Sequence, residues 1–484
     1  MTMERPRAKG IVMADVLGTP IGAELTRLAG AEPDLPALTC GAVTLSRREL
    51  EERANRFAWL LLDLGVGPGD RVAIVLPNGI DFVVSMLATW KAGGTPLPVV
   101  SRMPPAERTA ILDLADPKVI VAEDGVLPPS TGRTEPPPVA VSRQWKILAS
   151  GGSTGRPKLI ATTDPGVAEK AGGLGLAGQM PVGGTALVTA PLTHNGPFMA
   201  LTAGLLFGKH VVLMERFDAS EVLRLTEAHG IDWIYAVPTM MHRIWRLPAE
   251  QRDRADLSSL QIVFHLGAPI APWLKQAWID WLGPERIWEL YAGTEGQAAT
   301  LISGTEWLAH RGSVGRPLSG QIEIRDDDGH ALGPDEVGEV WMRSLSADPT
   351  YTYIGATARS DAGWESLGDL GHLDADGYLY LGDRSTDMIL VGGSNVYPAE
   401  IEGALEQHPA VACAAVIGLP DEDLGSVPHA IVQVSRTTDE TELQAHLKER
   451  LAAYKLPRTF EFVTEPLRDD AGKIRRSALR AARL

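Results

Sequence analysis

"LASGGSTGRPKLI", residues 148–160, brings three glycines, three hydroxyl side chains and two cations into the nine positions from 150 to 158. Glycine lets the backbone approach a ligand closely, and backbone N–H groups, hydroxyls and cations together bind phosphate oxygens. An ordinary surface turn with a basic end has the same composition, so composition alone leaves a polyphosphate site and a turn equally open.

Two well-known phosphate-binding motifs do not fit the glycine-rich segments of this chain. A Walker loop places Lys directly after its last Gly and then enters a helix. Here Pro157 precedes Lys158, and "KLIATT" has the pattern of a strand, so the loop is predicted to join two strands. A second run, "GLGLAG" at 173–178, has dinucleotide spacing but lacks a preceding strand and a following acid, and we interpret it as chance.

Strand-like and helix-like patterns alternate on both sides of this loop. The runs "RVAIVL", "HVVLM", "IDWIYAV" and "LQIVFHL" predict buried strands. "DFVVSMLATWKAG" and "ASEVLRLTEAHG" predict helices that end at Gly. Beyond about residue 320, "QIEIRDDDGHALG" and "GEVWMRS" predict hairpin strands, and a small unit of strands and helices follows residue 383. The alternation predicts layered α/β architecture.

Bulk properties limit the classes of function. The 484 residues correspond to two to four domains at roughly 100–200 residues each. The net charge of −16 disfavours nucleic acid or an anionic membrane as the main partner. Cys40 and Cys413 are the only cysteines, which excludes a disulfide framework or a cysteine metal cluster and fits a reducing cytoplasm. Without a signal-like or membrane-spanning segment, we expect a soluble cytoplasmic protein.

The segment 150–158 resembles the phosphate-binding loop of the adenylate-forming superfamily, which comprises acyl- and aryl-CoA synthetases, luciferases and peptide-synthetase adenylation domains. The resemblance covers nearly the whole chain, because further motifs occur in the family's order: "WKAGGTPLPV", "PLTHNGP", "HLGAPI", "YAGTEG", "LGDLG", "GDRSTDMILVGGSNVYPAEIE" and "DDAGKIRR". Within the family, "LTHN", "VPTMMHRIW" and "GGSTG" are most similar to bile-acid-CoA ligases and to acid-activating ligases of diterpenoid antibiotic pathways such as that for platensimycin.

The resemblance implies a fold and a reaction. Residues 1–383 are expected to form an α/β adenylation domain of layered sheets with flanking helices and a β-barrel-like subdomain. Residues 384–387 would be a hinge, and 388–484 a small mobile α+β domain. The reaction joins a carboxylic acid to ATP as acyl-AMP, releases pyrophosphate, and then transfers the acyl group to coenzyme A; Mg²⁺ accompanies the ATP.

The resemblance also implies the phosphate and magnesium residues. Thr294 would contact a phosphate, and Glu295 would ligate Mg²⁺ and act in catalysis. Taken alone, Glu295 would be interpreted as a solvated loop carboxylate. The β- and γ-phosphates would lie against the loop residues Ser150, Gly151, Gly152, Ser153, Thr154, Gly155 and Lys158.

The nucleoside would lie in a second group of residues. Asp369 would accept hydrogen bonds from both ribose hydroxyls, and Arg384 would fix the ribose or the α-phosphate. Outside the motif, a lone Asp or Arg in such a loop is more often a turn residue. The adenine would be enclosed by Gly267, Ala268, Tyr291 and Ala292, the last of which replaces the glycine usual in the family.

The C-terminal motifs carry the residues of the two half-reactions. Lys473 would bridge the carboxylate and the phosphate oxygen during adenylation, although such a basic run is ordinarily a solubilising tail. Gly392 and Gly393 would line the channel for the pantetheine thiol. Thr386 stands at the hinge where the family often carries Asp or Lys, which leaves open which residue controls domain rotation.

The acid pocket is the least specified part of the site. His194 would gate the pocket near the reacting carboxylate, although a lone histidine is more often structural. The remaining substrate contacts implied are Pro238, Thr239, Gly267 and Gly293. "VPTMMHRIW" predicts a helix entered through Pro238, on which Met240 and His242 could also face the pocket. Asp218 in "FDAS" is interpreted as a helix cap and not as a partner for an ammonium group, so we expect a bulky apolar acid without an amine.

Three functions follow in order of support. The first is an acid–CoA ligase that acts through acyl-AMP on a small-molecule acid. The second is an adenylating enzyme that stops at acyl-AMP or passes the acyl group to a carrier protein or partner enzyme. The third is a nucleotide-binding sensor, which the retention of Lys473, Glu295 and Asp369 disfavours. Homo-oligomerisation stays open.

Overall fold

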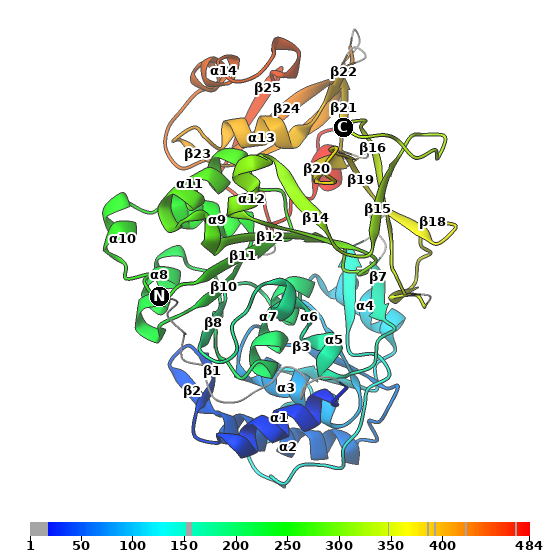
Figure 1. Cartoon of the computed structure of the whole chain (residues 1–484). Coiled ribbons are helices and arrows are strands. Elements are labelled where there is room, and N and C mark those ends of the chain that lie inside the picture. The colour runs from blue at the N-terminus through cyan, green and yellow to red at the C-terminus, as the bar shows by residue number, and fades with distance from the viewer. Residues whose placement is uncertain are drawn as a thin grey trace, which may run out of the picture.

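The computed structural model describes residues 18–151, 157–346, 348–384, 387–391, 394–421, 424–469 and 472–484. Helices and strands alternate through the larger part of the chain, as the hydrophobic patterns predict (Figure 1). Its helices are α1 (Ile21–Ala31), α2 (Arg47–Asp63), α3 (Ile80–Lys91), α4 (Pro105–Ala115), α5 (Ala168–Ala171), α6 (Gly173–Ala177), α7 (Asn195–Leu206), α8 (Ala219–His229), α9 (Pro238–Trp245), α10 (Ala249–Arg254), α11 (Pro272–Leu282) and α12 (Gly304–Ala309). None of the described helices is long and apolar enough to cross a membrane.

One long sheet runs through this part of the molecule. Its order is β15 (Gln321–Arg325), β16 (Gly338–Arg343), β19 (Trp364–Leu373), β20 (Leu379–Arg384), β14 (Ser313–Ser319), β13 (Ala299–Ser303), β12 (Ile287–Ala292), β11 (Ile262–Leu266), β10 (Trp233–Ala236), β8 (Thr185–Val188), β9 (His210–Leu213), β1 (Pro36–Cys40) and β2 (Val43–Ser46), with β18 (Ser360–Asp361) beside β19. Strands β12, β11, β10, β8, β9 and β1 are parallel, whereas β13 to β20 pair antiparallel. The hairpin strands predicted beyond residue 320 form this antiparallel end.

Two three-stranded sheets complete the larger part. The parallel one has the order β4 (Thr95–Pro98), β3 (Arg71–Val75) and β5 (Val119–Ala122). The antiparallel one has the order β17 (Tyr351–Ile354), β7 (Pro157–Thr162) and β6 (Ile147–Gly151). The glycine-rich segment therefore does connect two neighbouring strands, β6 and β7, which confirms the argument against a Walker loop.

Local signals explain where the helices begin and end. The Asp218 side chain accepts a hydrogen bond of 2.8 Å from the Glu221 backbone N–H, so "FDAS" is the predicted helix cap. Helix α8 then ends at Gly230, whose φ of 58° a residue with a side chain rarely adopts. Pro238 stands at the first position of α9, where its missing N–H costs no helical hydrogen bond.

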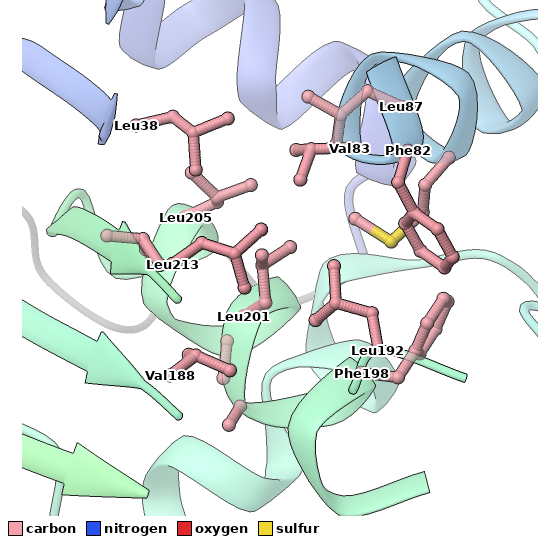
Figure 2. Packing of buried hydrophobic residues seen from close by; sticks show 14 of the residues in the cluster. Leu38, Phe82, Val83, Leu87, Val188, Leu192, Phe198, Leu201, Leu205 and Leu213 are labelled. Atoms are coloured by element: carbon pink, nitrogen blue, oxygen red, sulfur yellow. The ribbon is translucent and has the colours of Figure 1, made fainter. Parts of the chain in front are cut away.

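The main hydrophobic core lies between helices and the long sheet. Helix α7 is apolar on nearly every side, so its side chains fill space in several directions. Figure 2 shows Leu201 and Leu205 of α7 next to Leu38 and Leu213 from strands β1 and β9, with Phe82 and further residues of α3 beyond them. The middle and the end of α7 are thereby packed between these strands and α3.

The last hundred residues form a smaller α+β unit at one end of the molecule (Figure 1). Its elements are β21 (Ile389–Val391), β22 (Ser394–Val396), α13 (Pro398–Leu405), β23 (Val411–Asp421), β24 (Gly425–Val434), α14 (Glu440–Lys448), β25 (Thr459–Val463) and α15 (Arg476–Ala481). It has a hydrophobic core of its own around Val396, Leu405 and Leu443. Arg246, which follows α9, donates to the backbone carbonyls of His408, Pro409 and Val411 and so ties this unit to the larger part.

Candidate functional site

Four neighbouring parallel strands deliver most of the predicted site residues to one edge of the long sheet. In spatial order these strands are β8, β10, β11 and β12. The chain that follows each strand carries in turn His194, the pair Pro238 and Thr239, the pair Gly267 and Ala268, and the segment 293–295. The carboxyl ends of parallel strands point to the same edge, which is where α/β proteins bind their ligands.

The antiparallel sheet β17–β7–β6 adds a polar face at this place. Tyr353 pairs with Ile160 and Tyr351 with Thr162, so these four side chains share a face with Lys158. The opposite face carries Leu159 and Ala161, which belong to a hydrophobic core. Alternation along the strands thus separates a packing face from a face that can meet a ligand.

Glu295 is a fixed and buried carboxylate, with 7% of its surface exposed. The hydroxyl of Tyr353 donates to Glu295 Oε1 over 2.5 Å, and Lys158 Nζ lies 3.7 Å from the same oxygen. Lys158 Nζ also lies 3.9 Å from the centroid of the Tyr353 ring. Burial, and then the bond to Glu295, raise the pKa of Tyr353, which keeps its hydroxyl a donor. The interpretation of Glu295 as a solvated loop residue is therefore excluded.

The donor atoms at this point fit a hard cation. Glu295 supplies a buried carboxylate, and the neighbouring Thr294 supplies a hydroxyl, which are the oxygen ligands that Mg²⁺ prefers. Tyr353 was missed in the sequence analysis. Its only signal was the alternation in "YTYI", and the partner on which its role depends lies 58 residues away.

Asp369 lies on β19 with its carboxylate toward β12. The hydroxyl of Tyr291 donates to Asp369 Oδ2 over 2.7 Å, which joins a predicted adenine contact to the predicted ribose contact. A Cβ atom at Gly293 would lie 2.5 Å from Leu367 Cδ1, so the absence of a side chain at Gly293 lets Leu367 pack directly against this part of the backbone. The strand register pairs Asp369 with Arg384, whose side chain lies outside the described residues.

The backbone beside Lys473 reaches this edge from the C-terminal unit. A Cβ atom at Gly472 would lie 2.8 Å from Thr239 Oγ1 and 3.5 Å from Val237 Cγ2. A Cβ atom at Gly267 would lie 3.8 Å from Val237 Cγ1. The segment that carries Lys473 is therefore packed against Thr239, one of the predicted substrate contacts, and the Lys473 side chain is exposed.

The chain around His194 is held by close contacts with neighbouring side chains. His194 is the N-cap residue of α7, and it is half-buried. A Cβ atom at Gly196 would lie 2.4 Å from the Tyr235 hydroxyl oxygen, so α7 approaches β10 as closely as glycine allows. Asn78 Oδ1 accepts from the Leu192 backbone N–H over 2.9 Å. His194 is thereby presented at a defined place beside the strand ends.

A cavity of about 340 Å³ lies between the larger part and the C-terminal unit. Pro238 and Thr239 line it on one side, and Cys413 and Gln433 on the other. Three arginines also line it: Arg243, Arg246 and Arg468. Met240, which sequence analysis allowed to face the pocket, is instead 5% exposed and packs in the core near Thr189.

Part of the predicted site lies outside the described residues. This applies to Gly152, Ser153, Thr154 and Gly155 of the loop, to Thr386 at the hinge, and to Gly392 and Gly393. The side chain of Ser150 and the surroundings of Gly151 are likewise outside the description, although their backbone belongs to β6. Ala292 is exposed at the end of β12, and Ala268 is half-buried.

Lys146, just before β6, is a fully enclosed lysine with 3% exposure. Its Nζ donates to Asn195 Oδ1 and lies 3.4 Å from Met199 Sδ. Burial lowers the pKa of Lys146 to about 7, and the charge of Glu295 partly opposes this change. The sequence analysis gave Lys146 no role.

This pKa makes the stability of the protein depend on pH. Between pH 7 and the ordinary lysine pKa of 10.5, the unfolded chain binds more protons than the folded chain at Lys146, so wild-type stability rises with pH. A Lys146→Met variant lacks that rise. The unfolding free energy of the variant minus that of the wild type should therefore fall by about 3 kcal/mol from pH 6 to pH 9. Denaturant titrations at both pH values measure it, and parallel profiles would contradict it.

Comparison with known proteins agrees with this geometry. A family model described as AMP-binding enzyme matches residues 25–149 and 134–352, and one described as AMP-binding enzyme C-terminal domain matches residues 400–473. The chain belongs to this family. It is a member of the adenylate-forming superfamily of acyl- and aryl-CoA synthetases, as the resemblance predicted, and is an ATP-dependent enzyme of the acid–CoA ligase class.

Individual members of the superfamily match over nearly their whole length. A feruloyl-CoA synthase from an Amycolatopsis species is 31% identical over 492 residues, covering 95% of this chain and 98% of the relative. A fatty acid–[acyl-carrier-protein] ligase from Streptomyces coeruleorubidus is 30% identical over 488 residues, covering 93% of each. The solved o-succinylbenzoate CoA synthetase of Bacillus subtilis, in complex with its acyl-adenylate intermediate, has a TM-score of 0.80 at 27% identity and covers 95% of this chain and 98% of that one.

Proposed function

We propose that this AMP-binding enzyme converts a bulky apolar carboxylic acid to its acyl-AMP and then to its CoA thioester. The observation that carries the proposal is the packing of Gly472 against Thr239, because it brings the Lys473 segment to the strand ends where Glu295 and His194 also lie. Two anions must meet in the first step. Positioning and electrostatic neutralisation therefore supply most of the catalysis.

The residues divide the work of the first step. The glycine-rich loop and Lys158 bind the β- and γ-phosphates, Asp369 and Tyr291 hold the ribose and adenine, and the Lys473 ammonium neutralises the reacting carboxylate. Glu295 and Thr294 would hold Mg²⁺, which supplies charge neutralisation to the phosphates when it is bound. His194 and Thr239 line the acid pocket, whose specificity is for an acid without an amine.

The second step needs an entry for coenzyme A. The cavity between the two parts of the chain is lined by the exposed Arg243, whose guanidinium can meet a phosphate, while Arg246 and Arg468 in the same lining bind groups of the C-terminal unit. We assign the hinge to residues 384–387, between an adenylation domain of residues 1–383 and a mobile domain of residues 388–484. Rotation about this hinge would present Gly392 and Gly393 to the thiol.

A pyrophosphate-release screen tests the proposal. Aryl, fatty, steroid-like and diterpenoid acids are supplied with MgATP, with and without coenzyme A, and products are identified by mass. We expect release with at least one acid class and a thioester only when coenzyme A is present. A chain that releases no pyrophosphate with any class would contradict the adenylation step.

A second candidate function is transfer of the acyl group to a carrier protein. Two observations favour it: Thr386 departs from the residues common at the hinge, and one relative is named as an acyl-carrier-protein ligase. Under this alternative the same screen yields acyl-AMP but no CoA thioester, and the product appears only when a phosphopantetheinyl carrier protein is added.

Asp369→Ala is expected to raise the KM for ATP by about tenfold and to leave the KM for the acid nearly unchanged. The reason is that the variant loses charge-assisted hydrogen bonds to the ribose and the acceptor for Tyr291. Steady-state pyrophosphate release measures both constants. Asp376→Ala, which removes an exposed carboxylate from the turn after β19, is the matched control, and an unchanged ATP dependence in Asp369→Ala would remove Asp369 from the nucleotide site.

A further inference from the structure

Lys146 differs from the other enclosed lysines of the described chain. Four described lysines are buried: Lys91, Lys146, Lys209 and Lys275. Three of these have a carboxylate partner, respectively Glu51, Asp232 and Glu289. No carboxylate of the described residues lies within ion-pair distance of Lys146 Nζ. Burying a cation without a counter-ion lowers the stability of the fold. A functional role for Lys146 would explain why a lysine is present at this position.

The surroundings of Lys146 hold its ammonium in one place. Its backbone carbonyl accepts from the Thr162 N–H over 3.2 Å, and the carbonyl of Trp145 accepts from Trp90 Nε1 over 2.7 Å. Lys146 Nζ lies 4.6 Å from the centroid of the Trp145 ring. The ammonium therefore stands at the first turn of α7, where it meets Asn195 and Met199, one turn apart.

This contact decides which way the Asn195 amide faces. In its protonated form, the Lys146 ammonium only donates hydrogen bonds, so it selects Oδ1 and turns Nδ2 to the other side. Nδ2 donates to no acceptor among the described residues. It is also absent from the group of fully buried polar atoms that lack a hydrogen-bond partner among those residues. Asn195 is half-buried. Its two N–H donors are thus accessible, on the residue that follows His194 in the chain.

We propose that Lys146 is a positioning residue that orients Asn195, and that Asn195 Nδ2 donates a hydrogen bond to a carboxylate oxygen of the acid substrate. The inference rests on the proposed function, because it assumes an acid in the His194 pocket. The first turn of the twelve-residue helix α7 carries positive partial charge, which also favours an anionic oxygen at this point. The cation behind the amide polarises its N–H groups and strengthens their bond to the ligand.

The residues predicted to bind phosphate lie on other elements than Asn195, which favours the acid over ATP as the ligand of Asn195. Lys158 and Tyr353 meet Glu295 on the polar face of β7 and β17, whereas Asn195 belongs to α7 after β8. Asn195 follows His194 directly in sequence. Changes at Asn195 should therefore alter the binding of the acid and leave the binding of ATP intact.

Equilibrium binding measurements by thermal shift and titration test this inference. The probes are three carboxylates, cholate, laurate and cinnamate, and ATP is the reference ligand. The variants are Lys146→Met, Lys146→Arg, Asn195→Ala and Asn195→Asp. For the probe that wild-type protein binds most tightly, Lys146→Met and both Asn195 variants should raise the Kd about tenfold or more. The Kd for ATP should change less than twofold in both Asn195 variants, and Lys146→Arg should recover part of the loss, because guanidinium also only donates.

The Asn195→Asp variant distinguishes a role of Asn195 in binding the acid from a role in stabilising the fold. The carboxylate gives Lys146 a counter-ion, so the melting temperature should rise, while the acid loses its donor and binds more weakly. A purely structural role for Asn195 would not weaken acid binding in a stabilised variant. Lys91→Met is the matched buried-lysine control: it breaks an ion pair and should lower the melting temperature without changing the Kd of the probe. If Lys146→Met does not fold, the two Asn195 variants carry the test.

The possible results distinguish this inference from the proposed function. Unchanged probe affinity in the Asn195 variants, an equal loss of ATP affinity, or no binding of any probe by the wild type overturns the inference. Pyrophosphate release by the wild type reports separately on adenylation. Release together with unchanged variant affinities would leave the proposed function standing and remove only the role of Asn195.

Discussion

Lys473→Ala is expected to slow adenylation by about 100-fold or more, while thioester formation from supplied acyl-AMP stays close to the wild-type rate. The ammonium is assigned to the step in which a carboxylate attacks a phosphate, and that charge is needed only while both anions react. Gly472 packs on Thr239, so the alanine variant keeps the backbone placement and loses only the charge. Pyrophosphate release measures the first step, and mass detection of the thioester from synthetic acyl-AMP measures the second.

The informative result is a loss of the adenylation rate without a loss of the rate of thioester formation from acyl-AMP. An equal loss in both steps would contradict the assigned role and indicate damage to the fold or to a shared site. Arg480→Ala is a suitable control, because Arg480 is an exposed cation on α15, in the same basic tail. If the tail only improved solubility, both variants would behave like the wild type.

Glu295→Gln is expected to lower kcat/KM for MgATP by about 100-fold and to raise the Mg²⁺ concentration that gives half-maximal rate. The amide has nearly the shape of the carboxylate and can still accept from the Tyr353 hydroxyl, so packing is preserved. The variant removes one negative charge from an enclosed place where Lys158 is the nearby cation. Magnesium titrations of pyrophosphate release measure the effect.

Glu285→Gln controls for loss of charge near β12, since Glu285 is exposed in the turn that precedes this strand. Its magnesium dependence should match the wild type. A Glu295→Gln enzyme with an unaltered magnesium dependence would exclude Glu295 as a ligand. A selective rise in the KM of the acid would instead place Glu295 at the other substrate.

Much of the fold could be predicted from local sequence patterns. Pro157 and the strand-like "KLIATT" correctly predicted a loop between two strands, because proline and β-branched residues restrict the backbone locally. Asp218 and Gly230 correctly marked the ends of α8.

The contacts within the candidate site could not be predicted in the same way. Tyr353 meets Glu295, and Lys146 meets Asn195, across separations of 58 and 49 residues. Such contacts depend on the register of strands and the placement of helices, which no local pattern encodes. Met240 illustrates the same limit: helical spacing let it face the pocket, and packing turned it into the core. The motifs therefore locate the chemistry, while the supporting residues emerge only from the tertiary arrangement.

The guanidinium of Arg246 holds three carbonyl groups of the C-terminal unit, and its backbone continues directly from the helix that begins at Pro238. Any reorientation of that unit must therefore release several bonds together, which makes the change abrupt and not gradual. The balance between the two half-reactions can then be adjusted at a site remote from the reacting atoms. Substitutions at Arg246 would therefore change the rate of the domain rotation without changing the pocket that recognises the acid.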